Sequence, residues 1–323
     1  MKSFLTGGTG FIGGHVARKL RARGDDVVAL VRSPGKAGTL ANLGVETVEG
    51  DLSSTDAIRR GVEGADAVFH IGAVYEVGIP ASQRGAMEDA NVRGTERVLD
   101  AAIEAGVPRI VYVSTVACFG NTGGQVVDES YRRPDREFLS VYDETKFRAH
   151  ELAEERIRDG APIVIVQPGG VYGPGDHSEL GTMIDQARTG KLKAKMFPEA
   201  GFMFVHVEDV AEGILLAHDR GRVGESYVLA GQKGTMGELV DKVSYLAGRK
   251  PPRMTMPVAA MKASAPFGSI VGPLLGFPPN LRELINISDG VTYWATDEKA
   301  RRELGFAPRD LDTGLRQTLE ESV

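Results

Sequence analysis

The sequence predicts an α/β protein: a doubly wound parallel sheet followed by a smaller C-terminal lobe. Three observations predict this fold. Short apolar runs alternate with longer stretches of helical spacing through the first half of the chain. Glycine makes up 41 of 323 residues, nearly twice the usual share of about 7%. Several of these glycines cluster directly after the first apolar run. Strands separated by helices imply βαβ units and a sheet that is buried on both faces.

The elements of the first half follow from apolar periodicity. Strands are expected at Lys2–Leu5, Val27–Val31, Glu46–Val48, Ala67–His70, Arg109–Val113 and Pro162–Val166. Helices are expected at Ile12–Arg23, Ala86–Ala105 and Tyr142–Arg158. Gly24, Gly106 and Gly160 each follow a helical stretch, at the position where a left-handed cap takes glycine. These elements define an expected N-terminal domain over residues 1–166.

The second half of the chain is less regular. A loop rich in glycine and proline begins at Pro168, and a second loop precedes residue 207. Proline-rich residues 251–280 are expected to form a helical cap with turns. The expected helices are Gly181–Thr189, Val207–His218, Met236–Leu246, Asp297–Leu304 and Leu311–Ser322, with a strand at Ser226–Ala230. Residues 167–323 should therefore form mainly a second lobe, with parts of 205–230 returning to the first domain.

Composition excludes several classes of protein. The formal net charge is −6, which gives no general attraction to nucleic acid or anionic membranes. The single cysteine, Cys118, excludes an intramolecular disulfide framework and a cysteine-rich zinc site, and no metal-ligand cluster stands out. No apolar run approaches the roughly 20 residues of a membrane span, and the first residues do not match a secretory signal. We therefore expect a cytoplasmic protein with no metal, nucleic-acid or membrane partner.

The glycine cluster predicts a dinucleotide site. Residues 6–13 satisfy G-x-x-G-x-x-G through Gly7, Gly10 and Gly13, between a strand and a helix. Glycines there allow a tight turn and a close approach of a pyrophosphate, as in a Rossmann fold, and the helix N-terminus supplies free N–H groups. Residues 1–166 are thus expected to be the dinucleotide-binding domain. The expected contacts in the loop are Gly7, Thr9, Gly10, Phe11, Ile12 and Gly13.

The end of the second strand indicates which dinucleotide binds. An acid at this point would hydrogen-bond the ribose 2′-hydroxyl of NAD. The chain has Arg32 instead, with Lys36 close behind. A guanidinium can pair with a 2′-phosphate through its forked N–H groups. The sequence therefore favours NADP(H) over NAD(H); the alternative is that Arg32 is an ordinary solvated residue after a strand.

Tyr142 and Lys146 form the expected acid–base pair. They are four residues apart on a predicted helix, so both side chains project from one face. An unperturbed tyrosine has a pKa near 10, and a neighbouring ammonium would lower that pKa toward the working range. Tyr142 could then give a proton to a carbonyl oxygen while a nicotinamide gives hydride to the carbon. An exposed pair on a helix is the alternative reading of the same spacing.

Together, Thr6–Gly13 and Tyr142-x-x-x-Lys146 resemble the extended branch of the short-chain dehydrogenase/reductase family. Further segments match the family in the expected order: Asp51-Leu52, His70–Ala73, Asn91–Thr95, Gln167–Pro174 and Phe204–Ala211. The chain departs from the family at Gln167, where arginine is usual. The resemblance implies a homodimer through Ala86–Ala105 and Tyr142–Arg158. It also implies cofactor contacts from Asp51, Leu52, Ile71, Gly72, Ala73, Asn91, Ser114, Lys146, Pro168, Gly169 and Val171.

A third catalytic hydroxyl should come from the end of the fifth strand, where Ser114 and Thr115 are both available. Comparison with the family pattern, counting back from Gly120, places Thr115 at the catalytic position, where it would orient the substrate oxygen toward Tyr142. Ser114 would then make a cofactor or structural hydrogen bond. We interpret Cys118 and His70 as packing residues, and we expect His206 to make a structural hydrogen bond.

Reductases and nucleotide-sugar epimerases of the family share this triad, so the substrate residues must distinguish them. In the nucleotide-sugar enzymes an arginine that grips a diphosphate usually lies four residues before the equivalent of His206. Here that position is Phe202. The chain therefore resembles the dihydroflavonol reductase-like subgroup, which implies reduction of an aldehyde or ketone carbonyl on a small, largely apolar substrate. The alternatives are an epimerase or dehydratase that binds phosphate through Arg253 or Arg282, and a non-catalytic dinucleotide sensor.

Overall fold

Seven parallel strands form the central sheet, in the order β10-β6-β5-β4-β1-β2-β3. The structure, a computed structural model, describes residues 1–265 and 278–321. Every residue of β4, β5 and β6 is buried, which explains why these strands read as short unbroken apolar runs. The strands are β1 (Lys2–Thr6), β2 (Asp26–Val31), β3 (Glu46–Glu49), β4 (Ala67–His70), β5 (Ile110–Val113), β6 (Ile163–Pro168) and β10 (Ser226–Leu229).

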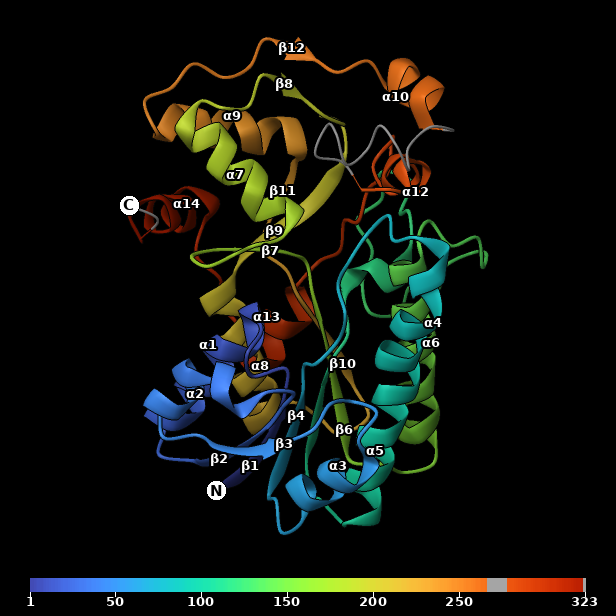
Figure 1. The fold of residues 1–323 in the computed structure, drawn as a ribbon, viewed down its shortest axis with the longest axis vertical. Coiled ribbons are helices and arrows are strands. Elements are labelled where there is room, and N and C mark those ends of the chain that lie inside the picture. The colour runs from blue at the N-terminus through green and yellow to red at the C-terminus, as the bar shows by residue number, and fades with distance from the viewer. Residues whose placement is uncertain (266–277, 322–323) are drawn as a thin grey trace.

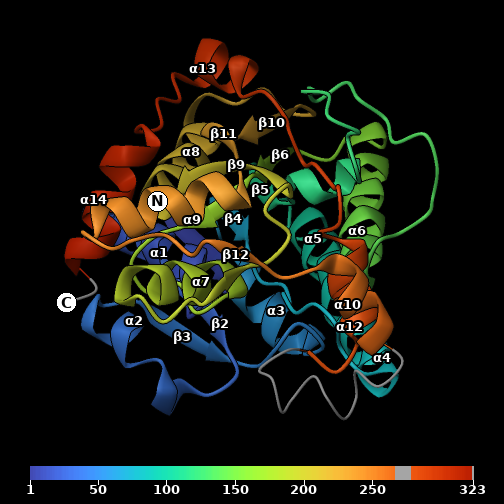
Figure 2. The same ribbon diagram turned by 90° about the horizontal axis from the view of Figure 1, so that it is seen from above.

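Helices cover both faces of this sheet (Figures 1 and 2). One face packs against α1 (Phe11–Ala22), α8 (Val207–Arg220) and α13 (Glu298–Leu304). The other packs against α3 (Thr55–Val62), α5 (Gly94–Glu104) and α6 (Val141–Arg158). Alternate residues of each strand enter the two cores, as Phe4 and Leu5 do from β1. The predicted doubly wound parallel sheet is confirmed.

The helix predicted over Ala86–Ala105 is continuous but not uniform. It consists of α4 (Arg84–Glu88), one π-helical turn at Asp89–Arg93, and α5. Such π-turns widen a helix locally and often occur at functional sites. Here the wide turn carries the buried side chain of Asn91, which acts on the loop after β4 as described below.

The smaller lobe stands above the carboxyl edge of the sheet in Figure 1. Its three-stranded sheet has the order β11-β9-β7, with helices packed on an apolar core that includes Tyr172, Phe204 and Leu239. The elements of the lobe are β7 (Gly170–Tyr172), α7 (Glu179–Thr189), β8 (Ala194–Lys195), β9 (Gly201–His206), β11 (Gln232–Thr235), α9 (Met236–Leu246), β12 (Met254–Thr255), α10 (Val258–Ser264), α12 (Leu281–Asn286) and α14 (Leu311–Glu321).

The sequence-based boundaries differ from the structure mainly in this lobe. Residues 201–206 were expected in a loop, but they form β9, which pairs with both β7 and β11. In the predicted cap over 251–280 the structure contains α10, while residues 266–277 lie outside the described part. The strand at 226–229 returns to the central sheet beside β6, so the chain passes between the two lobes more than once. Within 1–265 and 278–321, no helix is both long and apolar enough to cross a bilayer.

Candidate active site

The sheet topology gathers the candidate residues at one edge. β1 lies between β4 and β2. β2 and β3 extend the sheet on one side of β1, and the strands from β4 onward extend it on the other side, so the order in which strands are added reverses beside β1. Ligands of open α/β sheets bind at the carboxyl ends of the strands at such a switch point. The loops that follow β1, β4, β5 and β6 all leave from this edge. They carry the glycine cluster, Ile71–Ala73, Ser114–Thr115 and Gly169, which joins Pro168 at the end of β6 to β7 with Val171.

The glycine loop is shaped by close backbone contacts. Gly7 has a φ of 75°, and a Cβ there would lie 2.7 Å from the backbone nitrogen of Gly72. A Cβ on Gly13 would lie 2.0 Å from the carbonyl oxygen of Gly7. Both positions therefore require glycine. The Thr6 hydroxyl fixes the neighbouring loop, because it lies 2.7 Å from His70 Nδ1 and accepts a hydrogen bond from the Gly72 backbone N–H at 3.1 Å.

The N-terminus of α1 fits a phosphate. Gly10 is the N-cap residue, with no side-chain capping bond, and the first turn of α1 holds no acidic residue. Thr9 and Gly10 are exposed, while Phe11 and Ile12 are half-buried. Helix N–H groups without a side-chain cap, next to glycines that admit close approach, suit the pyrophosphate of a dinucleotide. The residues present therefore fit the predicted cofactor.

Arg32 and Asp51 lie close together at the outer part of this edge. Arg32 is exposed at the end of β2. The Asp51 carboxylate accepts hydrogen bonds from the Ser53 side chain and backbone and from the Ser54 hydroxyl, and these bonds, with attraction to Arg32, lower the pKa of Asp51. Leu52 is half-buried against the core. The Lys36 side chain lies outside the described part of the chain.

Asn91 is turned into the protein rather than toward the cofactor edge. Its Oδ1 accepts a hydrogen bond from the Val74 N–H at 2.7 Å, and its Nδ2 donates to the Val74 carbonyl and to Thr145 Oγ1. The side chain is buried, and both of its polar atoms are engaged in these bonds. Asn91 therefore ties the 71–74 loop to α6.

Tyr142, Lys146 and Thr115 meet where β5 ends against α6. Ser140 caps α6 by accepting from the Asp143 N–H, so Tyr142 lies in the first turn of the helix. The Thr115 side chain lies close enough to Tyr142 to lower the pKa of its hydroxyl. The Lys146 Nζ atom donates to the Val113 carbonyl at 3.0 Å and contacts the Tyr112 hydroxyl at 3.5 Å. The three residues predicted as a triad are therefore brought together.

Burial determines the electrostatics of this pair. It lowers the pKa of Lys146 to about 8. Burial also raises the pKa of Tyr142, and the neighbouring Tyr75 raises it further, whereas the nearby Thr115 side chain lowers it. The expected downward shift from Lys146 is therefore wrong for the free protein, because loss of hydration disfavours the phenolate more than the nearby groups favour it. Tyr142 is held protonated, the form that a general acid requires.

Ser114 and Thr115 point to different surroundings. Ser114 Oγ lies 2.9 Å from His150 Nδ1 and 3.3 Å from Cys118 Sγ, in the protein interior. Thr115 Oγ1 accepts a hydrogen bond from the Ala117 N–H, and the Thr115 side chain lies close enough to Tyr142 to lower the pKa of its hydroxyl. This geometry favours Thr115 over Ser114 as the hydroxyl beside the acid. Cys118 is buried, and its pKa is raised to about 11 by burial, as suits a packing residue.

The connection from β6 to β7 completes the edge. A Cβ on Gly169 would lie 2.3 Å from the Met203 carbonyl oxygen, so this glycine lets the loop pass closely over β9. Pro168 is buried, and Val171 packs partly buried on the main core. Gln167, where the resemblance leads one to expect arginine, is buried, and its Nε2 has no hydrogen-bond partner among the described residues.

Phe202 lies among aromatic side chains of the smaller lobe. Its ring stacks on Tyr293, with centroids 5.5 Å apart, and lies 6.0 Å from Phe204. The residue is half-buried and borders three apolar clusters. Packing in the lobe therefore accounts for much of its surface. Arg253 and Arg282, the alternative phosphate ligands, are both exposed.

Sequence reasoning missed two residues of this region. Tyr75 packs edge-on against the Tyr142 ring, with centroids 4.8 Å apart, and more than half of its surface is exposed. Nothing in its local sequence indicates that contact. His150 could have been found, because it follows Lys146 by four residues and so continues the face of α6 that carries Tyr142 and Lys146.

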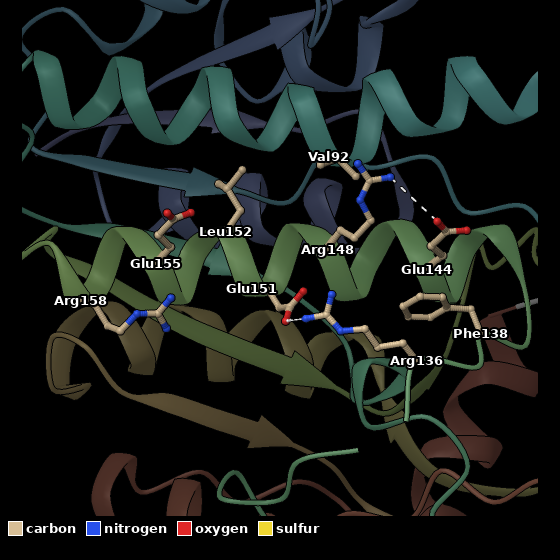
Figure 3. A pocket seen from close by; sticks show the side chains of 9 residues that line it. All are labelled: Val92, Arg136, Phe138, Glu144, Arg148, Glu151, Leu152, Glu155 and Arg158. Carbon is tan, nitrogen blue, oxygen red and sulfur yellow. Dashed lines mark hydrogen bonds and ion pairs between the residues drawn. The ribbon is translucent and has the colours of Figure 1, made fainter. Parts of the chain in front are cut away.

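An open concavity of about 450 Å³ lies elsewhere, on the outer face of α6. Figure 3 shows that charged side chains dominate its lining. Arg136 pairs with Glu151 at 2.6 Å, and Arg148 pairs with Glu88 at 3.0 Å. This surface is separate from the triad, so we do not treat it as the catalytic site.

Comparison with known proteins agrees with this geometry. The NAD dependent epimerase/dehydratase family model matches residues 3–230. A ketoreductase from Stigmatella aurantiaca, named for 4-hydroxy-2-methyl-3-oxo-4-farnesyl-3,4-dihydroquinoline-1-oxide, is 34% identical over 96% of this chain and 92% of its own. A putative dihydroflavonol 4-reductase from Synechocystis is 32% identical over 99% of this chain and 93% of its own. The crystal structure of a nucleoside-diphosphate-sugar epimerase from Pseudomonas aeruginosa is 26% identical, with a TM-score of 0.79 and coverage of 99% and 97%.

The chain belongs to the NAD dependent epimerase/dehydratase family, that is, to the extended short-chain dehydrogenases/reductases. The resemblance predicted from the sequence is confirmed, including the likeness to dihydroflavonol reductases. The protein is an NAD(P)-dependent enzyme of this type.

Proposed function

We propose that the protein is an NADP(H)-dependent reductase that converts an aldehyde or ketone carbonyl of a small, largely apolar substrate to an alcohol. The observation that carries this proposal is the contact of Tyr142 with Thr115 beside Lys146, at the sheet edge that also holds the glycine loop. That arrangement puts a proton donor and a second hydroxyl where a carbonyl oxygen can meet both.

Thr115, Tyr142 and Lys146 have separate roles in the proposed reaction. Thr115 donates a hydrogen bond to the substrate oxygen and orients it toward Tyr142. Tyr142, held protonated by its surroundings, gives its proton to that oxygen as negative charge develops there. Lys146 supplies positive charge one helical turn away, and its contacts with the Tyr112 hydroxyl and the Val113 carbonyl of β5 keep the ammonium in place. A bound reduced nicotinamide would supply the hydride to the carbonyl carbon.

Arg32 supports the preference for NADP(H). No acid ends β2, and the exposed guanidinium of Arg32 stands at the position where NAD enzymes bind the ribose hydroxyl with a carboxylate. A 2′-phosphate would find a forked donor there. Gly7, Thr9, Gly10, Phe11, Ile12 and Gly13 would hold the pyrophosphate, and the loops at 71–73 and 168–171 would border the nicotinamide half.

An apolar substrate is supported by the surroundings of Phe202. A nucleotide sugar carries about two negative charges on its diphosphate, and burying them without a cation costs several kcal/mol. Phe202 and its partners Tyr293 and Phe204 supply aromatic surface and no cation. The two reductase relatives agree with this choice by name. We assign residues 1–166, with parts of 205–230, to the cofactor and 167–323 mainly to the substrate.

The second candidate is a nucleotide-sugar epimerase or dehydratase, which the likeness to the Pseudomonas epimerase favours. The two functions differ in cofactor use. The test is to incubate purified protein with NADPH and, separately, a panel of apolar ketones and aldehydes and a panel of UDP- and dTDP-sugars. Stoichiometric loss of NADPH with a ketone supports the reductase. Conversion of a nucleotide sugar with no net loss of NADPH supports the epimerase, and binding without turnover in both panels supports the sensor.

We further propose that the enzyme acts in the cytoplasm as a homodimer, through the helices α4, α5 and α6. The charged outer face of α6 in Figure 3 offers both signs of charge to a second copy, through Arg148, Glu151 and Arg158. Sedimentation equilibrium tests the oligomeric state: a mass of one chain, unchanged by concentration, contradicts the dimer.

A further inference from the structure

Positive charge gathers in one part of the smaller lobe, although the chain as a whole has a net charge of −6. Two segments, residues 186–198 and 242–265, contain no aspartate or glutamate. Their cations are Arg188, Lys191, Lys193 and Lys195 in the first segment, and Lys242, Arg249, Lys250, Arg253 and Lys262 in the second. The acidic total therefore conceals a local excess of positive charge.

The fold brings these two segments together at two points. β8 and β12 pair in parallel, with Lys195 beside Thr255. At the turn before β8, a Cβ on Gly190 would lie 3.8 Å from Arg249 Cδ. β8 and β12 lie at the end of the smaller lobe that is farthest from the central sheet, and Figure 2 looks onto this end. Cations that are distant in the sequence thus share one end of the molecule.

Some of these cations are neutralised by carboxylates from outside the two segments, and the others are not. Arg188 pairs with Asp185, Lys195 with Asp241, Lys242 with Asp312 and Lys262 with Asp289. The remaining cations are exposed and form no ion pair with any described residue; they are Lys191, Lys193, Arg249, Lys250 and Arg253. We call these residues the basic patch. Neighbouring charges of one sign raise the local potential and attract a surface of the opposite sign.

Large apolar side chains stand among these cations. Tyr245 is 81% exposed and Met254 is 70% exposed, the highest values among the large apolar residues of 1–265 and 278–321. Tyr245 precedes Arg249 by four residues at the end of α9, and Met254 follows Arg253 on β12. A tyrosine ring and a flexible thioether both suit the boundary between lipid head groups and acyl chains. This end of the lobe therefore combines positive charge with accessible apolar surface.

We propose that the basic patch, with Tyr245 and Met254, binds the surface of an anionic phospholipid bilayer. The cations contact the lipid phosphates, and the two apolar side chains enter the head-group region. A nucleic acid would attract the same cations, but its phosphate backbone would give Met254 no apolar contact. The expectation of no membrane partner rested on the net charge of the whole chain, which does not describe this end of it.

This attachment is peripheral, and it gives the smaller lobe a role beyond holding the substrate. No helix within the described residues is suited to cross a bilayer, so the contact is with the membrane surface. For the proposed reductase, attachment brings the lobe assigned to an apolar substrate to the phase in which such a substrate dissolves. Binding to lipid itself does not depend on the reductase function and is measured without cofactor or substrate.

The test is flotation of the full-length protein with vesicles of phosphatidylcholine, either alone or mixed with phosphatidylglycerol. The protein should float with the mixed vesicles at about 0.1 M salt and should not float with phosphatidylcholine alone. Salt near 1 M should release it, because the Debye length falls from about 10 Å to about 3 Å. No flotation with the mixed vesicles, or equal flotation with both kinds, would overturn the proposal.

A matched pair of variants distinguishes the basic patch from the charge of the whole protein. Arg249→Glu and Arg60→Glu change the net charge equally, and both residues are exposed and without an ion pair to any described residue. Arg60 lies on α3, beside the central sheet. Arg249→Glu should weaken binding to the mixed vesicles at least about tenfold, because a basic residue near an anionic surface contributes about fivefold and the reversal also adds repulsion. Equal loss in the two variants would contradict a local site.

Met254→Ser distinguishes a bilayer from other polyanions. It should weaken binding to the mixed vesicles and leave elution from a cation-exchange resin unchanged, because the basic patch stays intact. Duplex DNA, added at a phosphate concentration equal to that of the lipid, should not displace the wild type from the vesicles. Wild-type vesicle binding by Met254→Ser, or displacement by the DNA, would overturn the assignment of a lipid partner. Urea unfolding checks that each variant keeps the wild-type stability.

Discussion

The cofactor edge and the smaller lobe are built by different means. At the cofactor edge, backbone atoms pack closely against each other. Gly7 packs against Gly72, Gly13 against the Gly7 carbonyl, and Gly169 against the Met203 carbonyl. In the smaller lobe around Phe202, aromatic side chains meet each other, as Phe202 does with Tyr293. A backbone contact admits only glycine, whereas many apolar side chains can fill the same space. Cofactor binding therefore depends on individual residues, whereas the choice of substrate depends on combinations of residues.

The largest expected effect lies where the two regions meet. Tyr142→Phe removes the donated proton and leaves the ring, its contact with Tyr75 and the cofactor edge in place. Its kcat should fall by about 10²-fold or more, while NADPH affinity stays nearly unchanged. Steady-state kinetics and fluorescence titration with NADPH measure the two quantities. Lys146→Ala should damage both, so a Phe variant that retains more than about one per cent of the wild-type kcat would mean that another group is the acid.

The second effect sharpens the account of the cofactor edge. Arg32→Asp replaces a forked cation with a repelling charge at the end of β2. A hydrogen bond to a charged group contributes about 1.5–3 kcal/mol, and 1.4 kcal/mol corresponds to a tenfold change in Kd. NADPH should therefore bind at least about tenfold more weakly, and NADH equally well or better. Titration with both cofactors measures the change; an unaltered preference would leave Arg32 as a solvated residue.

The third effect contrasts two adjacent glycines of α1. Gly13→Ala places a methyl group against the Gly7 carbonyl, and overpacking of this kind costs about 1–3 kcal/mol. Gly14→Ala is the matched control, because its Cβ would lie 3.7 Å from the nearest atom, and alanine favours a helix over glycine. Urea unfolding and NADPH titration should show loss of stability and affinity for the first variant only. Equal behaviour of the two variants would refute the backbone account of this loop.

The smallest effect concerns pH. Lys146 has a pKa of about 8 in the folded protein, below the ordinary value of 10.5, so the ammonium is present below pH 8 and is lost above it. The kcat for reduction should fall as pH rises through about 8. The effect on stability has the opposite sign. Between about pH 8 and 10.5 the unfolded chain holds the proton on Lys146 and the folded chain does not. The free energy of unfolding of the wild type should therefore rise with pH in this range relative to that of Lys146→Met. Urea unfolding measures this free energy at each pH. If it changed with pH in the same way in both proteins, the burial of Lys146 would be contradicted.

The difference between the two regions also explains how far the sequence could lead. The strands of the central sheet, the glycine loop and the positions of Tyr142 and Lys146 followed from local patterns, because each depends on spacing or on glycine. β9 was missed because its residues follow a glycine-containing loop, and its pairing with β7 and β11 joins distant segments. The pKa direction of Tyr142 and the inward turn of Asn91 depend on burial, which spacing does not reveal.

The central claim is net reduction of a carbonyl with Tyr142 as the acid. It is tested most directly by following deuterium from NADPH, labelled at the transferred position of the nicotinamide ring, into the product of the best ketone. The account predicts one deuterium on the new alcohol carbon for each NADPH oxidised by the wild type, and almost none with Tyr142→Phe over the same time. Nucleotide-sugar conversion with the NADPH pool unchanged, or equal deuterium transfer by the two proteins, would contradict it.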